Sequence, residues 1–313
     1  MTLTGPSPTI QRDRWGRPLI RPRPGDKPVA YTRATTIAGT LDDQQGLTRW
    51  KQRMTALGIA QRHDLLTAVA ATEPDDKRRL DGIVEQAVEA AGASTQATVG
   101  TALHAFVERI DRGMDLGPIP LEYAPDITAY QRVADQTGWK VHAVEQFVVH
   151  HGYRIAGTAD RLLEIDGKSY IADVKTGSID YPHKFAVQLA IYAWSMPYDI
   201  EAETTRAWSH EPDKDRGLII WLPAGQGRCE LRWVDLQAGR EALHLAMAVR
   251  DWRKRRDLLA AFDEPGFDPL IGEIRNAATV DDLELVWYNH RTTWGQRHTD
   301  AAAIRKAELS TLG

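Results

Sequence analysis

The chain has 313 residues, of which 42% are apolar and 26% are charged, and its net charge is −4. This is an ordinary profile for a globular protein with either one large domain or two smaller ones. The single cysteine, Cys229, excludes an intramolecular disulfide and any all-cysteine zinc or iron–sulfur site within the chain.

The remaining bulk features concern location and partners. No run of 18 apolar residues is present, so we expect no membrane span. The N-terminal residues lack a secretory signal, and we expect a cytoplasmic protein. Two basic segments, 10–28 and 250–256, are either solvated surface or contacts for a phosphate backbone. Their tryptophans, Trp15 and Trp252, are candidate platforms for base stacking.

The N-terminal third is predicted to be an arm followed by helices. Residues 1–30 are rich in proline, glycine and arginine, which favours an extended basic arm. From Thr35 to Arg112 the apolar spacing is helical, and a further short helix is expected at 126–137. The first long helix carries one predicted apolar stripe, formed by Leu47, Trp50, Met54 and Leu57.

The middle of the chain changes to the period of β-strands. The dipeptide Asp166-Gly167 separates two of the strands and is a strong signal for a hairpin turn. A helical pattern returns later and closes this part of the chain. The predicted strands are 140–150, 153–165, 168–176, 216–223 and 229–236, and the predicted helices are 183–196 and 237–262.

The C-terminal tail is predicted to be a helical hairpin with Thr279 and Thr299 as N-caps. The fold class is therefore α/β, with a central mixed sheet flanked by helices and helical additions at both ends. We expect three parts: the basic arm 1–30, a domain over 31–262, and the hairpin 263–313, which could bind a partner protein.

A group of polar residues lies on the predicted hairpin. Asp173 and Lys175 are two apart and project to the same side, whereas Val174 points into the core. The hairpin turn brings Asp160 alongside them. Such residues form either a strand-end ion pair or a metal site, because a buried acid needs compensation. Mg²⁺ prefers oxygen ligands, and a histidine ligand, His104, would admit Mn²⁺ more readily.

Three further residues belong to the same pattern. Gln188 and Tyr192 are four apart on a predicted helix and share a face. Glu145 lies in mid-strand and is a further ligand, a hydrogen-bond acceptor beside the ligands, or a charge at the edge of a hairpin. The other histidines, including His142, show no spacing typical of metal ligands.

These elements in this order resemble the PD-(D/E)XK nuclease superfamily and, within it, the RecB-like and phage-type exonucleases. The resemblance covers about residues 95–200, and its first acid is an aspartate in "GTAD" instead of a literal Pro-Asp. It implies a restriction-endonuclease-like core. The matching segments are Gly100 to His104, Gly157 to Asp160, Asp173-Val174-Lys175, and Gln188 to Tyr192.

The resemblance also implies roles for the residues. The metal ligands would be His104, Asp160, Asp173 and the backbone carbonyl of Val174. Lys175 would be the catalytic lysine and Glu145 an additional acid, while Gln188 and Tyr192 would support the lysine and contact the DNA backbone.

The function implied is a Mg²⁺- or Mn²⁺-dependent exonuclease for linear DNA, single- or double-stranded, in phage-type recombination, replication or end processing, without an iron–sulfur cluster. Two alternatives stay open. The first is a structure- or sequence-specific endonuclease, and the second is a non-catalytic module that binds DNA ends.

Overall fold

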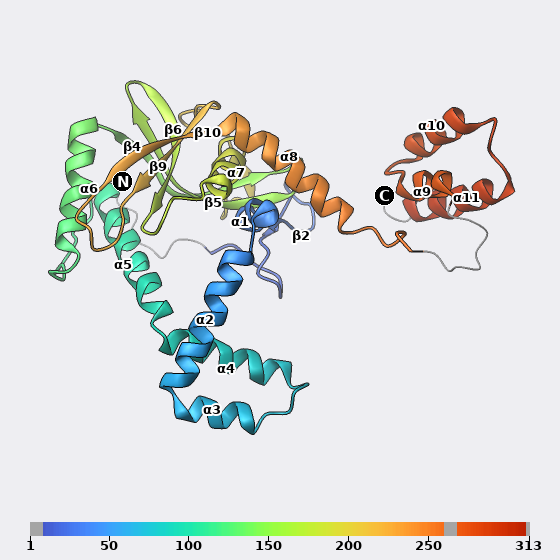
Figure 1. Cartoon of the computed structure of the whole chain (residues 1–313). Coiled ribbons are helices and arrows are strands. Elements are labelled where there is room, and N and C mark those ends of the chain that lie inside the picture. Colours follow the sequence, from blue (N-terminus) through green and yellow to red (C-terminus); the bar gives the residue numbers. More distant parts are fainter. Residues whose placement is uncertain (1–8, 260–267, 311–313) are drawn as a thin grey trace. The chain divides into compact units, whose positions relative to one another are not determined.

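The computed structural model describes residues 9–259 and 268–310 (Figure 1). The chain forms two compact units, of which the first ends at Arg250 and the second begins at Asp251. The expected boundary between residues 262 and 263 lies outside the described residues, as do the first eight residues of the expected arm. None of the described helices is both long and apolar enough to cross a membrane.

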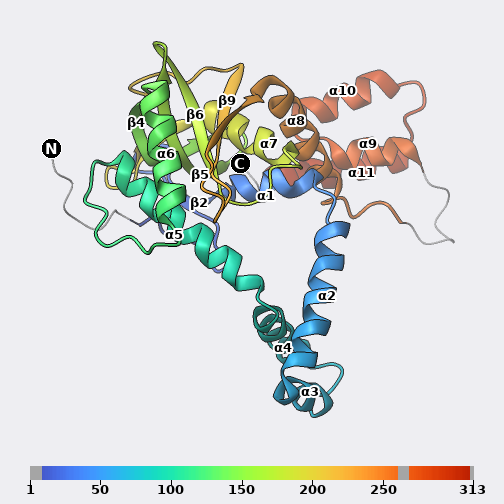
Figure 2. The same cartoon turned by 60° about the vertical axis from the view of Figure 1, so that its left-hand side comes forward.

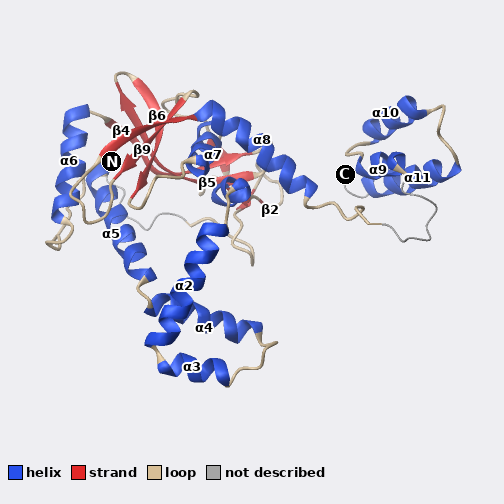
Figure 3. Cartoon of the chain, viewed as in Figure 1, coloured by secondary structure: helices blue, strands red, loops and turns tan. Residues whose placement is uncertain are grey.

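The first unit is built on a mixed sheet with the strand order β10-β9-β6-β5-β4-β7-β8, and β3 pairs with β5 (Figure 3). The pairs β6/β9 and β3/β5 are parallel and the others are antiparallel. The strands are β3 (Thr32–Arg33), β4 (Lys140–His150), β5 (Ile155–Ile165), β6 (Lys168–Lys175), β7 (Met196–Asp199), β8 (Thr204–Thr205), β9 (Arg216–Trp221) and β10 (Glu230–Asp235). The predicted α/β class with a central mixed sheet is thus confirmed.

The hairpin of β5 and β6 forms where the sequence predicts it. Asp166 and Gly167 both have positive φ, at 51° and 76°, as a type I′ turn requires. The second predicted strand begins at Ile155 instead of residue 153, because residues 151–154 make the turn from β4.

Helices cover both faces of the sheet (Figure 2). Ile171 and Ile219 belong to the core beneath α1, α7 and α8, whereas their neighbours Ala172 and Ile220 belong to the core beneath α5 and α6. This alternation follows from the two-residue period of a strand, and β6 is therefore buried on both faces. The helices are α1 (Ala34–Ala38), continued by the 3₁₀ turn Gly39–Leu41, then α5 (Ala93–Asp111), α6 (Ala124–Thr137), α7 (His183–Ala193) and α8 (Leu236–Trp252).

The described part of the basic N-terminal segment is partly folded onto this unit. Strands β1 (Leu19–Ile20) and β2 (Val29–Ala30) form a two-stranded ribbon. Ile20 and Tyr31 are buried and pack with Phe147 of β4. The segment from residue 19 onward is therefore not the irregular lead-in that its composition favours, because its few apolar residues reach the sheet.

Helices α2 (Gln45–Gln61), α3 (His63–Ala70) and α4 (Lys77–Ala90) form an arm that leaves the sheet, and α5 returns to it (Figures 1 and 2). The predicted apolar stripe of α2 is largely exposed: Leu47 is 48% exposed and Leu57 is 51% exposed. Instead, α2 packs on α4 through Gly58, where a Cβ atom would lie 1.8 Å from the carbonyl oxygen of Ala87. The periodic pattern predicted the helix correctly but not its buried face.

We expect the substitution Gly58→Ala to destabilise the arm by about 1–3 kcal/mol, because the added methyl group forces the two helix backbones apart. Limited proteolysis and chemical denaturation measure the effect. The matched control is Gly82→Ala in α4, where nothing lies within 4 Å of the new Cβ and helix propensity predicts a gain of about 0.5–1 kcal/mol. Equal protease resistance of Gly58→Ala and the wild type would contradict this packing.

Two predicted helices are shorter in the structure. The helix predicted over 183–196 ends at Ala193, because Met196 begins β7. The helix predicted over 237–262 ends at Trp252. Beyond it, Arg255 makes a bidentate ion pair with Asp257. Residues two apart do not face each other on a helix, so this pair is not compatible with a continued helix. Residues 260–262 lie outside the described residues.

The second unit has three helices in its described residues 268–310, not the two of the predicted hairpin. They are α9 (Pro269–Asn276), α10 (Val280–His290) and α11 (Gln296–Ser310). Thr279 caps α10 with a capping box, as predicted. Thr299 lies inside α11 and is not an N-cap. The helix begins earlier because His298 is buried, accepts a hydrogen bond from the Gly295 backbone and is paired with Asp268.

Candidate active site

The candidate site lies where β5 and β6 separate. Their pairing runs from Ile165 and Lys168 to Arg161 and Ala172 and ends there, whereas β6 stays paired with β9. One residue beyond the last pair, the Asp160 side chain accepts a hydrogen bond from the Val174 backbone at 3.1 Å. The Asp160 carboxylate thereby takes the place of the backbone carbonyl that would accept this hydrogen bond if the two strands stayed paired. Asp160 and Asp173 face each other where the strands separate.

Asp173 is the most deeply buried acid of this group, with 2% of its surface exposed. Its Oδ1 accepts a hydrogen bond from Gln188 at 3.3 Å. The Lys175 ammonium lies against Oδ2, but no donor in the described residues reaches that oxygen with good hydrogen-bond geometry. Burial and, next to it, the charge of Asp160 raise the pKa of Asp173 to about 7, although Lys175 acts in the opposite direction. The negative charge of this carboxylate is therefore only partly compensated.

Gln188 and Tyr192 of α7 hold the Asp173 carboxylate in place from the side of the core. The Gln188 amide bridges Asp173 and the Tyr192 hydroxyl, the latter at 3.2 Å. Gln188 is 7% exposed and Tyr192 is 2% exposed. A contact with DNA, which the sequence predicts for both, stays a prediction, and their burial favours a role in orienting Asp173.

Glycines of two predicted motifs allow close approaches at the site. A Cβ atom on Gly157 would lie 2.8 Å from the Tyr192 ring, and one on Gly100 would lie 2.7 Å from the Thr176 hydroxyl. Gly157 therefore lets α7 approach β5, and Gly100 lets α5 approach the end of β6. The spacing of both motifs has a packing reason beside any functional one.

Helix α5 turns one polar face toward the sheet, with His104, Glu108 and Asp111 at intervals of four and three. Asp111 forms a buried ion pair with Arg161 at 2.7 Å and accepts a hydrogen bond from Tyr130 at 2.8 Å. Because Arg161 directly follows Asp160 on β5, this pair fixes the helix of His104 against the strand of Asp160. This pair is not apparent from the sequence, because its two members are 50 residues apart.

His104 is a neutral imidazole at pH 7. Burial lowers its pKa, the charge of Asp160 opposes that shift, and Arg161 and Lys175 reinforce it. A neutral ring presents a lone pair to a metal ion. Glu108, one turn further along α5, contributes negative charge to this surrounding and is paired with Arg112 at 2.9 Å. Glu108 is four residues after His104, and this helical spacing could have identified it from the sequence as a residue on the same face.

Glu145 lies on β4 at the more exposed side of the site, with 40% of its side chain exposed. Its φ of 52° is unusual for a residue other than glycine and re-aims the side chain within the strand. The register of β4 and β5 places it level with Asp160. Burial raises the pKa of Glu145 to about 7, with a second contribution from the charge of Asp160.

A cleft of about 1290 Å³ opens beside these residues, and His104 and Thr176 form part of its lining. Two tryptophans line it as well: Trp50 from α2 and Trp221 at the end of β9. Arg228 lies over the Trp221 ring, with its guanidinium carbon 4.3 Å from the ring centroid. The tryptophans proposed from the basic segments, Trp15 and Trp252, are exposed and are not part of this lining.

Residues 63–209, just under half of the chain, match the model of the PD-(D/E)XK nuclease superfamily. All candidate site residues lie within the matched range. The match stops at the superfamily, and the likeness to RecB-like and phage-type exonucleases stays a prediction from the motifs. No curated protein is significantly similar to the chain.

The crystal structure of SSO0001 is 14% identical in sequence, with 75% of this chain and 94% of that chain covered. The TM-score of this comparison is 0.27.

Proposed function

We propose that the protein is a metal-dependent deoxyribonuclease that degrades linear DNA from its ends. The observation that carries the proposal is the buried Asp173 carboxylate, which faces Asp160, contacts Lys175 and lies within the range that matches a nuclease superfamily. The partly compensated charge of Asp173 and the oxygen-rich donor set fit a hard divalent cation. The ligands would be His104, Asp160, Asp173 and the backbone carbonyl of Val174, and the ion would be Mg²⁺ or Mn²⁺.

The protein's own groups supply the remaining chemistry. When bound, the metal ion would polarise the scissile phosphate and lower the pKa of a bound water molecule. Lys175, held by Asp173 at the end of β6, stabilises the negative charge that develops on the phosphate. Gln188 and Tyr192 keep Asp173 in place. Glu145 is either a further ligand or a hydrogen-bond acceptor beside the ligands.

The cleft supports a nucleic-acid strand as the substrate. Trp50 and Trp221 offer aromatic surface on which bases stack, and Arg228, whose guanidinium lies over the Trp221 ring, supplies a positive charge for phosphates beside that surface. A role in recombination, replication or end processing would also involve a partner protein. We place that contact on α10, where Leu285, Trp287 and Tyr288 are exposed side by side.

Two substrates separate the proposal from its alternatives. Linear duplex DNA and covalently closed circular DNA are incubated with the full chain in Mg²⁺ or Mn²⁺ and, in parallel, in EDTA. Metal-dependent loss of the linear DNA with intact circles supports an exonuclease. Nicking or linearisation of the circles would instead indicate an endonuclease. Retention of labelled DNA ends without turnover in either metal would indicate a non-catalytic binding module.

A further inference from the structure

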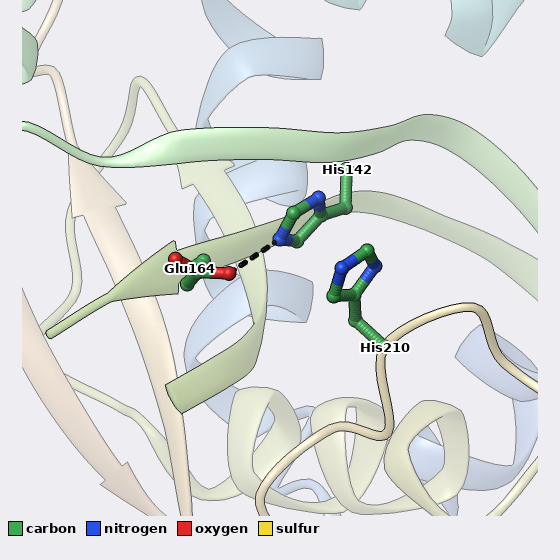
Figure 4. A group of neighbouring side chains, drawn as sticks. All are labelled: His142, Glu164 and His210. Carbon is green, nitrogen blue, oxygen red and sulfur yellow. Dashed lines mark hydrogen bonds and ion pairs between the residues drawn. The ribbon is translucent and has the colours of Figure 1, made fainter. Parts of the chain in front are cut away.

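A second cluster of metal-binding side chains lies apart from the candidate active site. It consists of His142 on β4, Glu164 on β5 and His210 in the loop before β9 (Figure 4). One ligand atom from each residue lies within 4.8 Å of the other two. Glu164 is four residues along β5 from Asp160, a distance of about 13 Å at the usual rise of a strand. The two groups therefore cannot share one ion.

The backbone places these three side chains together in two ways. The register of β4 and β5 shifts between Val141 and Ala143, so His142 is the extra residue of a β-bulge. Bulges re-aim side chains and are common beside functional sites. The loop of His210 is held along β6 by a hydrogen bond from the Asp213 backbone to the Ser169 carbonyl at 2.7 Å. This contact brings His210 to the β4–β5 hairpin, although His210 comes 68 residues after His142 in the sequence.

The three side chains of the cluster are in close contact with one another. His142 Nε2 lies 3.0 Å from Glu164 Oε2, and Lys140 donates to the other oxygen of Glu164 at 2.8 Å. The rings of His142 and His210 are stacked, with their centroids 3.4 Å apart and an angle of 6° between their planes.

We propose that His142, Glu164 and His210 bind a divalent transition-metal ion, with Zn²⁺ as the expected occupant, which fastens the loop before β9 to the β4–β5 hairpin. Two imidazoles and one carboxylate are a recurrent zinc ligand set that leaves one position for water. Imidazole suits Zn²⁺ better than Mg²⁺, which prefers oxygen ligands. The lone pair of an imidazole nitrogen lies in the plane of its ring, so two stacked rings do not point at the same ion. We therefore expect the exposed His210 ring to rotate toward the ion when the metal binds.

The test uses zinc binding by the full chain, in a background of His104→Ala, Asp160→Asn and Asp173→Asn that removes the candidate active-site ligands. After chelation, equilibrium dialysis against ZnCl₂ and elemental analysis give the affinity and the stoichiometry. We expect this background to keep one tight zinc site. His142→Ala, His210→Ala and Glu164→Gln should each weaken it at least about 100-fold. The matched control His63→Ala, at an exposed histidine of α3, should leave it unchanged.

X-ray absorption on the chain without substitutions, loaded with no more than one equivalent of zinc, keeps the proposal testable if a variant fails to fold. The proposed site predicts two imidazole nitrogens and oxygen ligands at about 2.0–2.2 Å. A spectrum with a single imidazole would match His104 with Asp160 and Asp173 instead, and would overturn the proposal. Unchanged zinc affinity in His142→Ala and His210→Ala would overturn it as well. The outcome does not depend on the proposed nuclease activity, because no arm of the test measures DNA hydrolysis.

Discussion

The Lys175→Ala variant is expected to hydrolyse linear DNA about 10²–10⁴-fold more slowly than the wild type, because it lacks the only ammonium that the described residues place against Asp173. The Lys175 side chain is 24% exposed and its ammonium lies 4.9 Å from the centroid of the Phe185 ring. The side chain is thus positioned at the solvent-facing edge of the site and is not part of the hydrophobic core, so we expect the variant to fold. The turnover rate on linear DNA under saturating Mg²⁺ measures the effect.

The matched control is Lys168→Ala, which removes the same side chain from the exposed start of the same strand. Its turnover rate should stay within a factor of about two of the wild type, since surface substitutions of this kind have small effects. Circular dichroism and thermal unfolding check that both variants are folded. If a folded Lys175→Ala protein turned over DNA at the wild-type rate, the assignment of Lys175 as a catalytic residue would be wrong. The main support for the proposed chemistry would then be lost.

The second large effect concerns Asp173→Asn, which should abolish metal-dependent hydrolysis and yet stabilise the metal-free protein at alkaline pH. The pKa of Asp173 is about 7 in the folded state, above the ordinary value of 3.8. A raised carboxyl pKa means that the folded state binds the proton more tightly than the unfolded state does. The stability contributed by the protonated form is therefore lost as pH rises from about 4 to about 7.

The asparagine variant lacks this loss, so its advantage over the wild type in EDTA should grow across the same pH range. Three pK units correspond to roughly 4 kcal/mol, which is an upper bound because the Lys175 contact is lost as well. Denaturant unfolding at pH 4.5 and pH 8.5 measures the difference. Asp166→Asn, at the exposed turn of the same hairpin, is the control and should show no such trend. A less stable Asp173→Asn protein at pH 8.5 would show that the carboxylate is already compensated.

The sequence was most informative where the physics is local. The two-residue period of the strands and the Asp166-Gly167 turn predict the β5–β6 hairpin with its register. That register alone brings Asp160 level with Asp173. The four-residue spacing of Gln188 and Tyr192 likewise predicts their shared face and hence their hydrogen bond. Each of these relations depends on residues that are close in sequence or joined by a short turn.

The sequence was least informative where the outcome depended on segments meeting at long range. The apolar stripe predicted on α2 is largely exposed, and Gly58 decides which side of the helix meets α4, because a residue without a side chain lets the two backbones approach closely. Trp50 and Trp221 were not identified as lining residues, since one comes from the helical arm and the other from the end of β9. The predicted tail hairpin lacked α9, which packs into that unit through Leu270 and Ile274.

The sequence by itself determined the α/β class, the order of the motifs and which neighbouring side chains share a face, because periodicity, turn chemistry and spacing act over a few residues. Only the tertiary structure decided what surrounds them. The Asp111–Arg161 pair, the positive φ of Glu145 and the grouping of His142 with Glu164 and His210 all arise from contacts between distant segments. Burial and charge in those contacts, which no local pattern encodes, set the protonation of Asp173 and His104.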